Sequence, residues 1–105
     1  MERYLIVIEK SETGFSAYSP DVLGCITTGK TPNQTIANMQ AALAFHLRGL
    51  LEDGEEIPMP RGVASYLDAE RDSEGEDYLI AHIATKDVVP ERVRSFELRV
   101  VVGAS

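Results

Sequence analysis

Residues 31–54 read TPNQTIANMQAALAFHLRGLLEDG, and this stretch decides the fold because it carries the signals of one long helix. Thr31 can cap its start, Pro32 suits the first helical position, where no amide donor is needed, and Gln34 completes a capping box with Thr31. Apolar side chains then recur at spacings of three and four residues, at Ile36, Met39, Leu43, Leu47 and Leu50. Such a stripe predicts a helix that covers a sheet, and Gly54 is placed to end it.

Three short strands are expected before this helix. Residues 3–10 are rich in β-branched side chains and apolar on both alternating faces, which predicts a buried, central strand. A turn signal at residues 11–14 leads into a second extended pattern at residues 15–19, so these segments should form a hairpin. After a break at residues 20–24, residues 25–28 offer a third strand.

The chain beyond the helix alternates between turn signals and strands. Residues 57–60, IPMP, cannot continue a helix because two prolines remove amide donors, and residues 62–66 are too short to assign. Residues 68–77 carry six acidic residues and one arginine, a net charge of -5, and are expected to form a solvated loop. Residues 78–84 predict a fourth strand and residues 95–102 a final one.

Together these elements predict an α+β fold with two layers, an antiparallel sheet and one long helix, in the order β-β-β-α-β plus a C-terminal strand. The 105 residues suit a single domain spanning 1–105, with no separate DNA-binding domain evident. The apolar runs are far shorter than the roughly 20 residues that cross a bilayer, so we expect no membrane association and a cytoplasmic location.

Composition narrows the class of function. Ten basic and seventeen acidic residues give a net charge of -7, which opposes attraction to phosphate backbones and argues against direct nucleic-acid binding. The same charge suits a basic partner, although it also serves solubility alone. Cys25 is the single cysteine, which excludes an intramolecular disulfide and a multi-thiolate zinc site within one chain.

Residues with catalytic chemistry are few. Cys25 could act as a nucleophile with His46 or His82 as its base, but a lone thiol in a strand is more often part of a core. The two histidines lack a neighbouring carboxylate pattern, and the glycines lie at turns and not in a phosphate-binding loop. We therefore predict no enzymatic activity, no catalytic or metal-ligating residues and no cofactor.

Several short motifs together resemble a known family. They are Tyr18-Ser19-Pro20-Asp21, Gly24-Cys25, Gly29, Thr31, Gly54 and Ile57-Pro58-x-Pro60. In order and spacing they resemble the N-terminal domain of the HicB antitoxins over roughly residues 3–60. The resemblance implies a small βββαβ domain, described as a partial ribonuclease H-like fold, that binds and inhibits a small basic mRNA-cleaving HicA toxin.

The expected function is therefore that of a non-catalytic antitoxin. One alternative is a stand-alone homo-oligomeric module of the same fold, structural or binding a small ligand, without a toxin partner. Another alternative is a nuclease remnant. Self-association as a dimer or higher oligomer is expected in each case, because residues 95–102 would otherwise leave an open sheet edge.

The partner-binding residues are expected in two groups. The first is the loop motif with Tyr18, Pro20, Asp21 and Gly24, and the second is the acidic segment with Asp72, Glu74, Glu76 and Asp77. For Asp21 two roles stay open: a side chain that accepts hydrogen bonds from backbone amides of its turn, or an exposed acceptor for an arginine or lysine of the partner.

Overall fold

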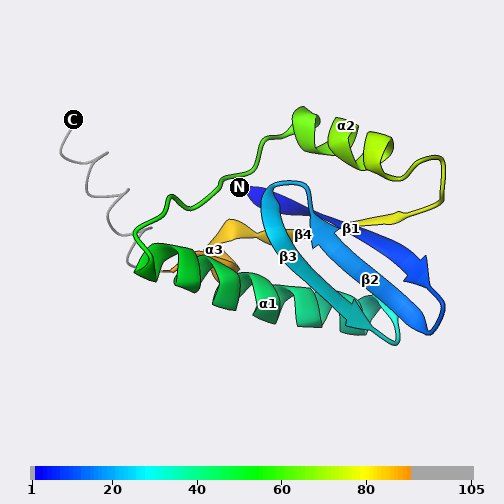
Figure 1. The fold of residues 1–105 in the computed structure, drawn as a ribbon, viewed down its shortest axis with the longest axis horizontal. Helices are drawn as coiled ribbons and strands as arrows, with labels where there is room; N and C mark the ends of the chain where they lie inside the picture. Colours follow the sequence, from blue (N-terminus) through cyan, green and yellow to red (C-terminus); the bar gives the residue numbers. More distant parts are fainter. Residues whose placement is uncertain (1, 91–105) are drawn as a thin grey trace.

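A four-stranded antiparallel sheet lies between two helices in the computed structural model, which describes residues 2–90 (Figure 1). The strands lie in the order β3-β2-β1-β4. Along the chain the elements are β1 (Arg3–Ser11), β2 (Gly14–Ser19), β3 (Val22–Gly29), α1 (Pro32–Glu52), α2 (Val63–Asp72), β4 (Leu79–Ala84) and α3 (Thr85–Val88). The predicted α+β fold, with three strands before a long helix and a fourth after it, is confirmed.

Strand β1 is the centre of the sheet, as predicted from its two apolar faces. It pairs with β2 on one side and with β4 on the other. Tyr4, Ile6 and Ile8 belong to the main core with α1, whereas Leu5 and Val7 form a second, smaller core on the opposite face. All five side chains are buried, so both faces of β1 are covered.

Helix α1 begins where the capping signals place it. The Thr31 side chain accepts a hydrogen bond from the Gln34 amide at 3.1 Å, and Gln34 Oε1 accepts one from the Lys30 amide at 2.7 Å. Met39, Leu43 and Leu47 are fully buried against the sheet, and Ile36 and Leu50 pack at the margin of the same core. This predicted stripe therefore does bury the sheet face formed by Tyr4, Ile6 and Ile8.

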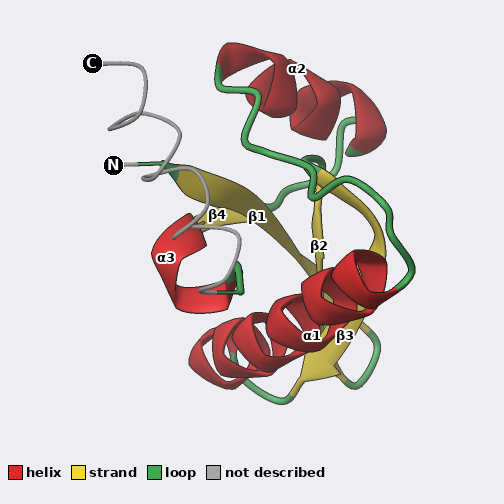
Figure 2. Ribbon diagram, turned by 90° about the vertical axis from the view of Figure 1, so that its left-hand side faces the viewer, coloured by secondary structure: helices red, strands yellow, loops and turns green. Residues whose placement is uncertain are grey.

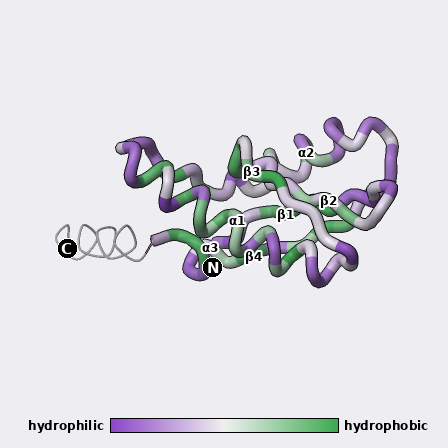
Figure 3. Tube along the Cα trace, turned by 60° about the horizontal axis from the view of Figure 1, so that its bottom comes forward, coloured by the Kyte–Doolittle hydropathy of each residue, from purple (hydrophilic) through white to green (hydrophobic). Residues whose placement is uncertain are grey.

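Helix α2 lies on the other face of the sheet, opposite α1 (Figure 2). The prediction of a solvated loop over residues 68–77 is wrong for residues 68–72, which form the second half of this helix. The buried residues of α2 are Ser65 and Ala69, a small pair at i and i+4, so the packing face carries no large apolar side chain that a periodicity could reveal. The helix and the loop after it are largely hydrophilic (Figure 3).

The chain after α2 returns to the sheet. Strand β4 matches the predicted strand apart from Tyr78, and α3 carries Val88 into the main core, where Val89 joins it. The predicted strand at residues 95–102 lies outside the described residues. No helix within residues 2–90 is long and apolar enough to cross a membrane.

Candidate partner-binding site

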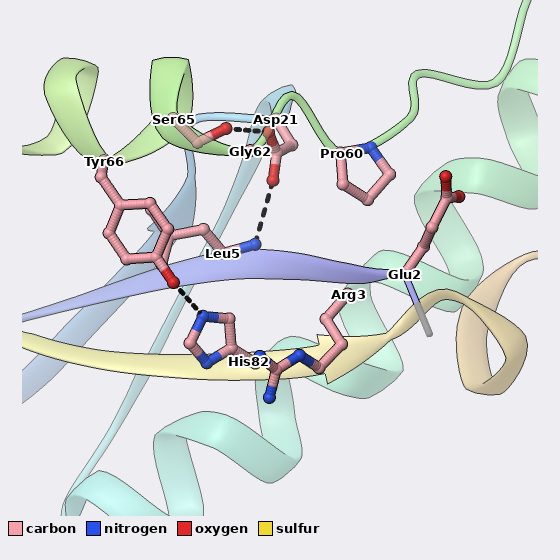
Figure 4. A pocket seen from close by; sticks show the side chains of 9 residues that line it. All are labelled: Glu2, Arg3, Leu5, Asp21, Pro60, Gly62, Ser65, Tyr66 and His82. Atoms are coloured by element: carbon pink, nitrogen blue, oxygen red, sulfur yellow. Dashed lines mark hydrogen bonds between the residues drawn. The ribbon is translucent and has the colours of Figure 1, made fainter.

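Asp21 ties three separate segments together at the end of the β1–β2 hairpin. The paired residues of these strands end at Val7 and Tyr18. Beyond that point Asp21 Oδ2 accepts a hydrogen bond from the Leu5 amide at 3.0 Å, so the carboxylate continues the ladder (Figure 4). Its other oxygen, Oδ1, accepts from the Arg61 amide at 3.1 Å and from the Ser65 hydroxyl. The side chain is 1% exposed, so these contacts are shielded from water.

Arg61 lies on the solvent side of this network, with its side chain 42% exposed. Its Nη2 donates to the Pro20 carbonyl at 2.8 Å and to Asp68 Oδ2 at 2.6 Å, and its Nε lies 3.6 Å from Asp21 Oδ1. The hydrogen bond from Arg61 lowers the pKa of Asp68, which also pairs with Arg71 at 3.1 Å. The guanidinium thus fastens the loop after β2 to the first two turns of α2.

These contacts decide which part of the loop faces solvent. Pro20, Asp21 and Val22 are buried, but Leu23 is 85% exposed and Gly24 is exposed beside it. Gly24 has φ +84°, a conformation that side chains with a Cβ rarely adopt, and a Cβ there would lie 3.7 Å from His46. The loop therefore presents one large apolar side chain directly after a backbone segment that is held in place.

Leu23 stands at the edge of a groove of about 580 Å³, called the Leu23 groove below. It is lined by Pro20, Asp21 and Leu23 from the loop, His46 and Leu50 from α1, Glu55, Glu56 and Pro58 from the linker, and Arg61 and Asp68. Four carboxylates meet one guanidinium in this lining, and the guanidinium already contacts two of them. The groove therefore combines an exposed apolar side chain with an excess of negative charge.

The second predicted group lies at the other end of α2 (Figure 1). Asp72 is the last helical residue and accepts from Arg71 Nε at 3.4 Å. Glu74, Glu76 and Asp77 follow in an exposed turn, in which Glu74 has φ 53°. Because α2 has 10 residues and a helix rises 1.5 Å per residue, about 15 Å separates this segment from the Asp21 end.

Tyr18 and Pro20 support the surface more than they form it. Tyr18 packs against the small core beneath α2, and its hydroxyl is buried without a hydrogen-bond partner in the described part of the chain. Burial, followed by the charges of Glu9 and Asp72, raises the pKa of this phenol. Asp21 does accept hydrogen bonds from backbone amides, but the prediction that these belong to its own turn is wrong, because they belong to Leu5 and Arg61.

A second cavity, of about 390 Å³, opens between β1, β4 and the start of α2 (Figure 4). The Tyr66 hydroxyl lies 2.6 Å from His82 Nε2 at its wall. Burial, and then the charge of Arg3, lowers the pKa of His82, so the ring is neutral at pH 7. Ser65, which also lines the cavity, is engaged by Asp21, so these polar side chains already satisfy one another.

The three residues considered for catalysis, Cys25, His46 and His82, each have a different environment. Cys25 belongs to the main core, and burial raises the pKa of its thiol, which disfavours the reactive thiolate. His46 lies beside Gly24 at the Leu23 groove, and His82 is hydrogen-bonded to Tyr66. Within residues 2–90, no three His, Cys, Asp or Glu side chains are grouped so as to hold a metal ion.

The family model described as a HicB-like antitoxin of bacterial toxin-antitoxin systems matches residues 4–100. The chain belongs to the HicB-like antitoxin family. The resemblance inferred from the loop and helix motifs is thereby confirmed.

Two curated relatives match part of this HicB-like chain. Antitoxin HicB 2 of Photorhabdus laumondii is 36% identical over 58 residues, which cover 55% of this chain and 42% of the relative. An uncharacterized 14.9 kDa protein of Haemophilus phage HP1 is 39% identical over 64 residues, covering 61% of this chain and 48% of the relative. The chain therefore spans about half the length of these relatives.

Solved structures of HicB proteins share the fold. A chain of the HicA3 and HicB3 toxin-antitoxin complex is 31% identical with a TM-score of 0.64, and the match covers 76% of this chain and 93% of that one. The HicB3 antitoxin crystal structure gives 30% identity and a TM-score of 0.63 over 77% of this chain and 60% of HicB3. Antitoxin HicB of Burkholderia pseudomallei, at 19% identity and a TM-score of 0.64, covers 98% of this chain and 86% of that one and shows the fold alone.

Several residues of the site escaped sequence reasoning. Arg61 and Ser65 lie 40 and 44 residues from Asp21, so no local pattern connects them. Glu55 and Glu56 were detectable as part of the acidic run EDGEE at residues 52–56, which follows α1 directly. Only the fold shows that Glu55 and Glu56 of this acidic run line the same groove as Leu23.

Proposed function

We propose that this chain is a non-catalytic antitoxin that binds and neutralises a small basic mRNA-cleaving toxin of the HicA type. The observation that carries the proposal is the match to 93% of a chain from the HicA3 and HicB3 toxin-antitoxin complex, in a chain that belongs to the HicB-like family. Inhibition would come from covering the catalytic surface of the toxin. Because the toxin acts on mRNA, the pair would work in the cytoplasm.

The Leu23 groove is the surface we assign to the toxin. An RNA-cleaving protein needs a cationic surface for its substrate, and four carboxylates line this groove. Leu23, 85% exposed at its edge, supplies the apolar contact that a charged rim alone lacks. The hydrogen bonds at Asp21 and Pro20 hold the backbone before Leu23, which lowers the entropy cost of binding because this part of the loop is already ordered.

The acidic group with Asp72, Glu74, Glu76 and Asp77 has a different role in this proposal. It lies at the far end of α2, so it would attract a cationic toxin over distance and would not line the same contact. Tyr18, Pro20, Asp21 and Gly24 hold or shape the loop that carries Leu23.

Binding to the toxin encoded beside this gene tests the assignment. Leu23→Ala should raise the dissociation constant about fivefold or more, which corresponds to about 1 kcal/mol. Ile26→Ala is the matched control, since Ile26 is also on β3 and 71% exposed but lies outside the groove lining. The Leu23 variant should also rescue growth less well when both proteins are expressed together.

Two results would contradict the proposal. If no basic toxin is encoded nearby, or if the purified chain fails to bind it, the alternative function of a stand-alone module without a toxin partner is favoured. If binding occurs but both alanine variants bind like the original chain, the toxin docks elsewhere and the groove assignment fails.

A further inference from the structure

Tyr66 and His82 meet at the wall of the cavity of about 390 Å³ between β1, β4 and the start of α2, called the Tyr66 cavity below (Figure 4). The Tyr66 oxygen lies 2.6 Å from His82 Nε2, and the ring centroids are 6.0 Å apart. A hydroxyl within hydrogen-bond reach of an imidazole is the arrangement that activates side-chain oxygens as nucleophiles. Tyr66 is 42% exposed, and the cavity has the volume of a small-molecule site.

His82 is suited to take up the proton of this hydroxyl. Burial, and then the charge of Arg3, lowers the pKa of His82, so its ring is neutral at pH 7. In the tautomer that carries its proton on Nδ1, Nε2 accepts the hydrogen bond from the Tyr66 hydroxyl. The pair therefore has the geometry of a nucleophile and its general base.

Arg3 brings a positive charge to the same end of the cavity. Its guanidinium lies beside His82 and makes no ion pair with any residue of the described range 2–90 (Figure 4). The Glu2 carboxylate points away from the imidazole, at the other end of the cavity (Figure 4). An anion seated on Arg3 would cancel the charge that lowers the pKa of His82 and would make the imidazole a stronger base. The cavity therefore favours an anionic reagent over a neutral one.

The other three tyrosines have environments that disfavour the same chemistry. Tyr4 is fully buried in the main core, and the Tyr18 hydroxyl is buried beneath α2. Tyr78 donates to a Glu70 carboxylate oxygen at 2.7 Å, and this hydrogen bond raises the pKa of the phenol. A carboxylate is also a weaker base than an imidazole. Tyr66 is therefore the tyrosine whose hydroxyl is both accessible and paired with a neutral base.

We propose that Tyr66 is an acylation site, at which an acyl phosphate held by Arg3 transfers its acyl group to the tyrosine oxygen. This class of donor combines an activated carbonyl with an anionic leaving group. The phenolic oxygen attacks the carbonyl carbon while His82 Nε2 takes up the phenolic proton. The new oxygen–carbon bond replaces the bond from that carbon to the phosphate oxygen, and the phosphate leaves as an anion beside Arg3. The products are an ester on Tyr66, inorganic phosphate and a protonated His82.

Acylation would change how α2 is held on the sheet. The Tyr66 hydroxyl and His82 Nε2 form the hydrogen bond that joins α2 to β4. An ester oxygen has no proton to donate, so this bond is lost when the acyl group is added. The contacts of Asp21 with Leu5 and Ser65 remain, and they keep the start of α2 attached to β1.

The test incubates the purified full chain with acetyl phosphate at neutral pH and locates the products by peptide mass spectrometry. Hydroxylamine separates the two kinds of product, because it removes tyrosine esters but leaves acetylated lysines intact. Tyr66 should be acetylated about tenfold or more faster than Tyr78, the matched tyrosine without an imidazole. His82→Gln should slow acetylation of Tyr66 by a similar factor, whereas Tyr78→Phe should leave it unchanged.

A neutral donor tests the role of Arg3 separately. Arg3→Gln should slow the reaction of Tyr66 with acetyl phosphate but not with N-acetylimidazole, which carries no phosphate. This comparison also decides the case in which His82→Gln does not fold. Equal rates at Tyr66 and Tyr78, an unchanged Tyr66 rate in a folded His82→Gln chain, or equal slowing with both donors in Arg3→Gln would overturn the proposal. None of these measurements involves the toxin, so their outcome is independent of the proposed antitoxin function.

Discussion

Replacing Asp21 with alanine should remove about 3 to 5 kcal/mol from the free energy of unfolding. The carboxylate is 1% exposed and accepts from the Leu5 amide, the Arg61 amide and the Ser65 hydroxyl. Alanine leaves these three donors without their acceptor, and each buried unsatisfied donor costs about 1–3 kcal/mol, with less than full additivity among neighbours. For a domain whose total stability is about 5–15 kcal/mol, this is a large share.

Asparagine at position 21 tests how much of this stability depends on having two acceptor oxygens. It keeps the size of the side chain but offers one acceptor oxygen, so it can serve either Leu5 or the pair of Arg61 and Ser65. We expect Asp21→Asn to cost about 1 to 3 kcal/mol, less than alanine. Asp77→Asn makes the same chemical change at an exposed position of the described chain and should leave the unfolding midpoint unchanged.

Urea denaturation followed by circular dichroism measures these free energies, and amide hydrogen exchange locates the effect. Exchange should accelerate most in α2, because Asp21 is the buried link between this helix and β1. A loss below about 1 kcal/mol for Asp21→Ala, or acceleration spread evenly over the sheet, would refute the role of the carboxylate as the link.

Two further predictions concern stability. Gly29→Ala should cost about 1–3 kcal/mol, because the new Cβ would lie 2.4 Å from Oγ1 of the buried Thr35. Gly49→Ala, with nothing within 4 Å in the last turn of α1, should instead gain about 0.5–1 kcal/mol, and equal thermal shifts in both variants would contradict this reasoning. His82 has a lowered pKa when folded, so its neutral ring contributes stability above about pH 6.5 that is lost as the pH falls through the folded pKa. Nuclear magnetic resonance titration should place its midpoint below 6.5, with Arg3→Gln moving it upward, and a midpoint at 6.5 in the original chain would be inconsistent with this burial.

The parts of the fold that could be predicted are those with large apolar side chains in a regular pattern. Strand β1 alternates on two apolar faces, and α1 repeats Met39, Leu43 and Leu47 at helical spacing. Helix α2 was missed because its buried positions are Ser65 and Ala69, while Val63 and Leu67 point outward at 74% and 65% exposure. The apolar side chains of α2 face solvent. A search of the sequence for apolar side chains that would form a core therefore does not locate this helix.

The contacts of the Asp21 loop could be predicted only in part. The family motif singles out this loop as a candidate for partner binding, and an aspartate after a proline suggests hydrogen bonds to backbone amides. The donors, however, come from residues 16, 40 and 44 positions away, and only the tertiary fold brings them to one carboxylate. Leu23 is a candidate because its side chain is 85% exposed although Val22 directly before it is buried.

The two acidic groups should affect different rates of toxin binding. Glu55 and Glu56 line the groove beside Leu23, so a bound toxin would shield them from water, and replacing both with glutamine should speed dissociation as well as slow association. Glu74 and Glu76 lie about 15 Å along α2, beyond the roughly 10 Å over which charges act at 0.1 M salt.

Glu74→Gln with Glu76→Gln should therefore slow association at about 50 mM salt, lose that effect at about 300 mM, and leave dissociation unchanged. Surface plasmon resonance at both salt concentrations separates the two rates. If the Glu74 and Glu76 pair instead controls dissociation while Glu55 and Glu56 do not, the toxin contacts the C-terminal end of α2. The Leu23 groove would then not be its docking surface.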